Sequence, residues 1–250
     1  VLKQRPELRQ QIYIQSKCGI RFKDNSTPQR YDFSASWIVQ SVDGILQRLR
    51  TDHIDILLLH RPDPLMEPDE VNEAFAKLVE SGKVRHFGVS NMHAGQVQLL
   101  HQALEFPLIV NQIEMSLTNL GWLEEGVYAG NPAGQHVNFT SGTLEQARQQ
   151  DIQLQAWGAL SQGKYTGAHC ALTPKEQQTK QLVTELADKY GVSSDAVVLA
   201  WLLRHPAKIQ PIIGSTNPQR IAACSNATRT LMSREDWYRL YVGARESELP

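Results

Sequence analysis

Long apolar runs, closely spaced cysteines and an excess of one charge are all missing from this 250-residue sequence. The longest apolar stretches, such as 54–59, are far too short to cross a bilayer, so we expect no membrane partner. Three cysteines, Cys18, Cys170 and Cys224, are scattered at spacings that suit neither a zinc site nor a disulfide framework. No metal is therefore expected, and a reducing cytoplasm is the simplest setting. The 25 Lys and Arg nearly balance the 26 Asp and Glu, which gives no support to a nucleic-acid partner.

Glycine-rich nucleotide-binding motifs are also absent, since no G-x-G-x-x-G follows an apolar run and no P-loop occurs. What the sequence does contain is a regular alternation of short apolar runs with amphipathic segments. The runs predicted as strands lie at 12–15, 54–59, 86–89, 108–113, 152–157 and 210–213. Two of them, 54–59 and 108–113, are nearly continuous in apolar residues, as is typical of parallel strands buried on both faces.

Helices are predicted between these strands from their apolar faces and their capping residues. The expected starts are marked by Ser34 or Ser36, by Pro68, by Ser193 or Ser194, and by Asn217. The longest stretch predicted to be irregular is 119–141. Alternating strands and helices predict one α/β domain, residues 1–250, with a parallel sheet and helical crossovers. Six strands leave two architectures open, an open doubly wound sheet and an eight-stranded barrel whose first two strands are missing.

Polar or aromatic residues stand at the carboxyl end of every predicted strand, which is the end where barrel enzymes place their active sites. Taken singly, these residues have ordinary explanations. Lys17 alone is most simply a lysine reaching into water, and His60 alone is most simply a structural histidine. Six such strand ends in one chain are hard to explain by chance.

These strand ends carry motifs in a fixed order: S-K-x-G, L-L-L-H-R-P-D, G-K-V-R-H-F-G-V-S-N, N-Q-I-E, A-W-G-A-L and P-I-I-G-S-T-N-P-Q-R-I. In this respect nearly the whole chain resembles the aldo-keto reductase family, and most of all bacterial oxidoreductases with H-R-P-D-P. The resemblance implies a (β/α)8 TIM barrel, a small-molecule carbonyl substrate and, by default, a monomer. It further implies that the protein reduces an aldehyde or ketone to an alcohol by hydride transfer from NADPH.

Two residues match catalytic positions of that family, and each role has a chemical reason. Lys17 matches the lysine whose ammonium lowers the pKa of a catalytic tyrosine. His60 matches the histidine that hydrogen-bonds the substrate carbonyl.

The resemblance also assigns residues along the whole length of NADPH. Ser90, Asn91 and Gln112 match the groups that hold the nicotinamide carboxamide, because amides and hydroxyls both donate and accept hydrogen bonds. Trp157 matches the aromatic residue that stacks under the ring. Arg220 matches the partner of the 2′-phosphate, which favours NADPH over NADH. The pyrophosphate loop and the helix N-terminus that follow are matched by Gly158, Ala159, Leu160, Gln162, Gly163, Lys164, Gly214, Ser215, Thr216 and Asn217.

Three departures from the family pattern accompany this match. Ala223 and Cys224 replace the usual Glu and Asn near the adenine, and Gly214 replaces a frequent Lys or Arg. The family's D-x-A-x-x-Y-G motif, with its catalytic Tyr and Asp, does not occur. From this we expect that the N-terminal part, with the first two strands, is absent and that this chain alone has little activity. Within this chain, Tyr31 is the candidate to replace the missing catalytic Tyr.

Two other functions stay open on the sequence alone. One is a catalytically inactive NADP-binding barrel, either a fragment or a non-catalytic subunit. The other is a Schiff-base aldolase with Lys17 as the nucleophile.

Overall fold

The computed structural model describes residues 2–167 and 171–250, and Cys170 lies outside these ranges. The chain divides into two compact units, which are described separately. The first unit contains residues 1–112 and 149–152, and the second contains residues 113–148 and 153–250. The expectation of a single domain over 1–250 stays a prediction.

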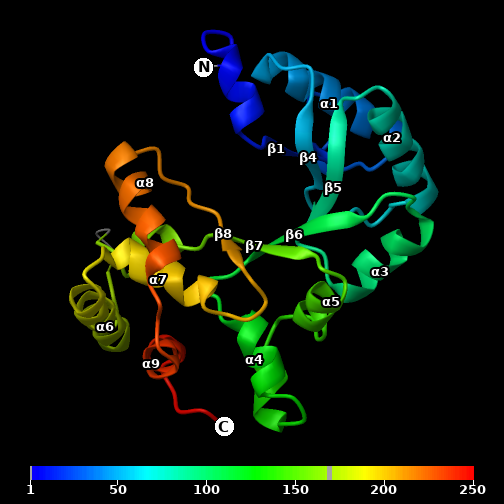
Figure 1. Ribbon diagram of the computed structural model, residues 1–250. Helices are drawn as coiled ribbons and strands as arrows, with labels where there is room; N and C mark the ends of the chain where they lie inside the picture. Colours follow the sequence, from blue (N-terminus) through cyan, green and yellow to red (C-terminus); the bar gives the residue numbers. More distant parts are fainter. Residues whose placement is uncertain (1, 168–170) are drawn as a thin grey trace. The chain divides into compact units, whose positions relative to one another are not determined.

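Among the described residues, a six-stranded sheet has the hydrogen-bonded order β1-β4-β5-β6-β7-β8 (Figure 1). The pairs β1–β4, β4–β5, β5–β6 and β7–β8 are parallel. This arrangement confirms the α/β class and is consistent with a TIM barrel. The strands are β1 (Gln15–Cys18), β4 (Ile54–Leu59), β5 (Val84–Ser90), β6 (Leu108–Glu114), β7 (Gln153–Trp157) and β8 (Gln210–Pro211).

Three helices accompany the strands of the first unit, and their starts follow the predicted caps. Ser34 caps α1 (Ala35–Leu49) by accepting the Trp37 N–H, so Ser36 is not the cap. α2 (Pro68–Glu80) begins at its proline, as expected. α3 is Ala94–Ala103. A short helix, η1 (Pro6–Gln11), and an antiparallel pair, β2 (Ile20–Arg21) with β3 (Arg30–Tyr31), were not predicted.

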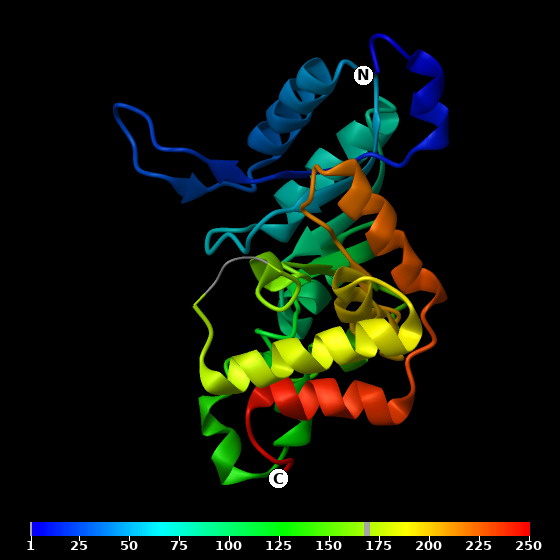
Figure 2. The same ribbon diagram turned by 90° about the vertical axis from the view of Figure 1, so that its left-hand side faces the viewer.

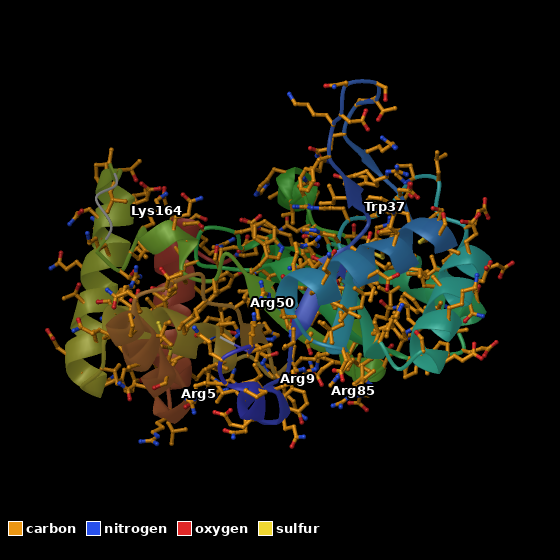
Figure 3. All side chains as sticks on the ribbon, turned by 90° about the horizontal axis from the view of Figure 1, so that it is seen from above. Arg5, Arg9, Trp37, Arg50, Arg85 and Lys164 are labelled. Atoms are coloured by element: carbon orange, nitrogen blue, oxygen red, sulfur yellow. The ribbon has the colours of Figure 1, made fainter. Side chains whose placement is uncertain are left out.

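A buried carboxylate fixes the entry to β1 and explains why the predicted strand at 12–15 is wrong. Asp55 is 1% exposed, and its Oδ2 accepts hydrogen bonds from the Ile14 N–H at 2.8 Å and from Arg9 at 2.8 Å. Its Oδ1 accepts from Arg85 at 3.0 Å (Arg9 and Arg85 are labelled in Figure 3). Arg9 also binds the Ile12 carbonyl, so that residue makes no ladder pair. The strand therefore starts at Gln15 and places Lys17 inside it.

Among its described residues, the second unit contains four α-helices in the C-terminal part of the chain, α6 to α9. α6 (Pro174–Tyr190) ends at Gly191 in the left-handed conformation, and Ser193 caps α7 (Ser194–Leu203), as one of the two expected serines. α8 is Pro218–Ser225 and α9 is Arg234–Arg245. Figure 2 shows α6 and α9 side by side, and the Thr179 hydroxyl donates to the Gly243 carbonyl at 2.8 Å between them.

The segment 119–141 is not irregular throughout, contrary to the prediction. It contains α4 (Gly121–Val127) and the short helix η2 (Pro132–His136), and α5 (Thr143–Gln149) follows it. A seven-residue helix with two glycines has little stability of its own. Burial of Trp122 and a paired, buried Glu124 stabilise it: Arg245 of α9 binds both oxygens of that carboxylate at 3.0 Å.

An aromatic cluster forms part of the core of the second unit. Trp201 and Trp237 are stacked with centroids 5.4 Å apart, and each indole N–H donates to the other residue's carbonyl. Trp122 lies edge-on to Trp201 and to His205. Nδ1 of His205 accepts the Ala207 N–H at 3.2 Å, which requires an unprotonated nitrogen.

His205 makes the folded state sensitive to acid. Burial first, and then the charge of Arg148, lower the pKa of His205 from 6.5 to about 4, against an opposing effect of Glu145. The unfolded chain therefore binds a proton that the folded chain does not, so stability should fall as the pH drops from about 6.5 to about 4. His205→Gln should flatten this decline in urea unfolding measured across that range. His86→Gln, at an exposed position, is the matched control, and a full slope in His205→Gln would contradict the assignment.

Candidate functional site

Lys17 and His60 lie together in the first unit. Lys17 pairs in register with Leu58 of β4, and His60 follows the end of β4, where its N–H donates to the Cys18 carbonyl at 3.0 Å. Both side chains line one cavity of about 470 Å³, with Trp37 of α1 (labelled in Figure 3) on its wall. The structure thus brings the two predicted catalytic residues into a single cavity.

The electrostatics of this cavity set the protonation of both groups. Burial lowers the pKa of Lys17 below its ordinary value of 10.5. Burial, and then the positive charges of Lys17 and Arg61, lower the pKa of His60 below 6.5. His60 is therefore a neutral imidazole at neutral pH, which both donates and accepts a hydrogen bond.

The predicted carboxamide residues form one network at the ends of β5 and β6. The buried Ser90 hydroxyl donates to the Gln112 carbonyl at 2.8 Å, and the Asn91 N–H donates to the same oxygen at 3.0 Å. The Asn91 side-chain amide donates to Ser90 Oγ at 2.9 Å and to the His60 carbonyl at 3.3 Å. The network therefore ties the strand ends of β4, β5 and β6 together.

Asn91 holds an unusual backbone conformation, with φ at 57°. Only glycine adopts this left-handed region freely, while asparagine tolerates it better than other residues do. The turn directs the chain away from β5 immediately after Ser90. Asparagine at position 91 therefore suits both the left-handed backbone of this turn and the hydrogen bonds that its side chain makes.

The predicted pyrophosphate loop lies in the second unit and turns sharply after β7. Trp157 is the last residue of β7, and Gly158 follows with φ at 69°. Gln162 and Gly163 also have positive φ, at 55° and 84°, within η3 (Ser161–Gly163). Ala159 is buried, Leu160 precedes η3, and Lys164 forms an ion pair with Glu176 of α6. This ion pair already engages the one cation among the predicted loop residues.

The N-terminus of α8 is capped by the protein itself. Asn217 Oδ1 accepts the N–H groups of Gln219 at 2.9 Å and Arg220 at 3.3 Å, and the Asn217 N–H donates to Ser215 Oγ at 3.2 Å. Thr216 is exposed, and a side chain at Gly214 would meet nothing within 4 Å. The predicted helix start is confirmed, and the side chain of Asn217 is its N-cap.

Arg220 is neither a free phosphate ligand nor a solvated charge in this structure. Its Nε and Nη2 each lie 2.9 Å from an oxygen of Asp195, in the first turn of α7. No sequence motif points to Asp195 as the partner of Arg220, because the two residues lie 25 positions apart. An acidic residue in the first turn of a helix has an ordinary explanation in the helix dipole.

The two ends of a nicotinamide dinucleotide differ in how well the chain's residues suit them. Ser90, Asn91 and Gln112 offer the amide and hydroxyl groups that a carboxamide requires. Gly158 occupies a left-handed position and is exposed, which leaves the loop backbone accessible to a phosphate there, whereas Gly163, also left-handed, is buried. At the 2′-phosphate end, the expected cation is already paired with a carboxylate. The donor set therefore fits the nicotinamide end better than the 2′-phosphate end.

The other sequence expectations have the following outcomes. Tyr31 lies in β3, pairs with Ile20 and is 38% exposed. Its role as a substitute proton donor stays a prediction, as do the individual roles of the predicted site residues.

Over the residues that the structure describes, no helix is long and apolar enough to span a membrane. The same residues contain no group of three or more His, Cys, Asp or Glu that could hold a metal ion.

Comparison with protein-family models gives a match to the aldo/keto reductase family over residues 1–241. The chain is 37% identical to the uncharacterized oxidoreductase YcsN of Bacillus subtilis, over 98% of this chain and 77% of that protein. It is also 37% identical to a 6-dehydroglucose reductase of Agrobacterium fabrum, over 99% of this chain and 77% of that protein. For the oxidoreductase YdhF of Escherichia coli the identity is 36%, over 100% and 78%.

Among solved structures, the chain is similar to the thermostable aldo-keto reductase Tm1743, crystallised with the inhibitor epalrestat. The TM-score is 0.67 at 23% identity, and the match covers 84% of this chain and 67% of that one. This likeness supports the fold. The family match begins at residue 1, and the comparisons do not bear out the expectation that an N-terminal part is missing.

The left-handed turn at Asn91 should be visible in stability. Asn91→Gly should lose only the side-chain hydrogen bonds, about 1 kcal/mol, whereas Asn91→Ala should also incur backbone strain of about 1 kcal/mol more. Urea unfolding of both variants measures the difference. At Asn226, where φ is −64°, the same two changes should rank in the opposite order. Equal stability of the two Asn91 variants would show that the turn is unstrained.

Proposed function

Because the chain belongs to the aldo/keto reductase family, we propose that it is an NADPH-dependent oxidoreductase that reduces an aldehyde or ketone to an alcohol. The observation that carries the proposal is the shared cavity of Lys17 and His60. In the same unit, the network of Ser90, Asn91 and Gln112 provides the donors and acceptors for a carboxamide. A cytoplasmic location and a monomeric state remain predictions from the sequence.

The chain's own residues would act on the substrate oxygen. When bound, a reduced nicotinamide supplies the hydride that converts the carbonyl carbon to an alcohol carbon. His60, neutral because its pKa is lowered, can donate a hydrogen bond to the carbonyl oxygen. The Lys17 ammonium in the same cavity stabilises the negative charge that develops on that oxygen. The same ammonium would give the oxygen the proton that completes the alcohol, and would take a proton back from water.

The substrate class is suggested by relatives rather than by the cavity. The Agrobacterium fabrum protein, and a second relative at 33% identity in Novosphingobium aromaticivorans, are both named 6-dehydroglucose reductase. A sugar aldehyde is therefore the first substrate to test, alongside simple aliphatic and aromatic aldehydes. Loss of NADPH absorbance in the near ultraviolet is the assay.

Lys17→Met should lower kcat by about a hundredfold or more, because it removes the ammonium that shares the cavity with His60 without changing the shape of the side chain much. The NADPH dissociation constant should change by no more than about threefold, since the carboxamide network is left intact. Lys23→Met, in the exposed segment between β2 and β3, is the matched control. Turnover of Lys17→Met close to that of the control would contradict the catalytic assignment.

Cofactor binding can be tested separately from turnover. A nicotinamide stacked on Trp157 should quench part of the fluorescence of the five tryptophans when NADPH is titrated. Trp157→Phe should abolish that part while still binding NADPH in calorimetry. Equal quenching in the variant would show that Trp157 does not contact the ring. Binding without turnover of any carbonyl compound would instead favour the catalytically inactive barrel.

One further function is favoured by a specific observation, since a half-buried lysine with a lowered pKa can also form a Schiff base. Borohydride treatment with a carbonyl substrate distinguishes the two chemistries. A reductase leaves Lys17 unmodified, whereas an aldolase gives a stable secondary amine on that residue.

A further inference from the structure

The pair of Arg220 and Asp195 is a tight, two-point interaction within the second unit. Nε and Nη2 of the guanidinium lie 2.9 Å from Oδ2 and Oδ1, so one edge of Arg220 faces the carboxylate. This geometry combines two charge-assisted hydrogen bonds with charge neutralisation. It raises the pKa of Arg220 above its already high value.

The pair is asymmetric in its exposure to water. The Asp195 side chain is 9% exposed, whereas that of Arg220 is 44% exposed. If Arg220 turned away to a new partner, it would leave a nearly buried carboxylate without its cation. Breaking a pair of this kind from one side is strongly unfavourable. A phosphate that reaches Arg220 must therefore bind its outer edge while Asp195 keeps the inner edge.

The neighbouring anion-binding groups are also engaged. The N–H groups at the start of α8 that belong to Gln219 and Arg220 already donate to Asn217. A phosphate dianion that reaches this part of the second unit therefore meets the Arg220–Asp195 ion pair, whose net charge is close to zero. A ribose hydroxyl, which carries no charge, is not penalised in the same way.

We propose that Asp195 sets the cofactor selectivity of this protein by neutralising Arg220, so that a 2′-phosphate gains less over a 2′-hydroxyl than an unpaired Arg220 would give it. The inference rests on the proposed function, because it refines how the cofactor's ribose end is recognised. NADPH and NADH then bind with dissociation constants closer together than Arg220 alone would give. Asp195 acts through Arg220, and is a residue that determines specificity rather than one that touches the reacting atoms.

The test uses Asp195→Asn, which keeps the shape and one acceptor for Arg220 but removes the negative charge. NADP⁺ and NAD⁺ are titrated into the unchanged protein and the variant by isothermal calorimetry, at fixed ionic strength. We expect NADP⁺ to bind about tenfold tighter to the variant, the effect of one unit charge several ångströms away in a partly solvated site. NAD⁺ should change by no more than about twofold. Thermal unfolding of each protein reports whether the variant is folded.

Two further proteins isolate the effect. In Asp195→Asn combined with Arg220→Ala, the gain for NADP⁺ should disappear, because it acts through the guanidinium. Glu185→Gln, which removes the carboxylate bound to Arg239 between α6 and α9, should leave both constants unchanged.

The outcomes separate the inference from the function on which it rests. Tighter NADP⁺ binding in Asp195→Asn alone supports the inference. Unchanged or weaker NADP⁺ binding, in a protein that still binds NAD⁺, overturns it and assigns Asp195 to holding Arg220 in place. Failure of the unchanged protein to bind either dinucleotide overturns the proposed function, and the inference with it.

Discussion

A carboxylate that leaves water must be paired, and this one requirement organises much of the chain. The described residues meet it with cations and donors from distant parts of the sequence. Asp55 forms ion pairs with Arg9 and Arg85, and Glu124 forms one with Arg245. Asp236 of α9, 2% exposed, takes Lys189 and Tyr190, both from the end of α6. Each of these pairs joins segments that no local sequence rule connects, and each fixes where an element begins or which helix it packs against.

The same requirement shapes the chemistry of the two units in different ways. In the first unit, Lys17 forms no ion pair with a carboxylate among the described residues, and it shares a cavity with His60. In the second unit, Arg220 and Lys164 are both paired with carboxylates. In the part of the chain that the structure describes, positive charge is thus left without a carboxylate partner at Lys17, and is compensated in the segments that were expected to bind phosphates.

The sequence was sufficient for the order of the six strands of the parallel sheet and for those capping residues whose effect is local. Ser34, Ser193 and Asn217 each accept an N–H from the first turn of the helix that they precede, so neighbouring residues determine the outcome. The start of β1 could not be predicted in this way. Ile12 and Tyr13 are apolar enough for a strand but are 45% and 86% exposed, because Arg9 and Asp55 hold the chain before Gln15.

The site residues also divide into those that local sequence identifies and those that depend on distant contacts. Lys17 and Ser90 lie within β1 and β5, and His60 and Asn91 directly follow β4 and β5. Their nearness to strand ends could be predicted from the sequence, and their individual roles stay predictions. Asp195 could not be found, because its partner is brought to it by the packing of α8 near α7. The helical part of 119–141 was missed for a similar reason: α4 depends on contacts with α9, which lies more than a hundred residues away.

The pairing of Glu124 with Arg245 has a consequence for kinetics. The two residues lie 121 positions apart, so closing the chain between them is costly in entropy and yields nothing until both helices are in place. We therefore expect this interaction to form late, after the main barrier to folding has been crossed. The ion pair therefore has little effect on the rate at which α4 and α9 assemble, and it mainly slows the rate at which they separate. The short, glycine-containing α4 is then maintained by slow opening.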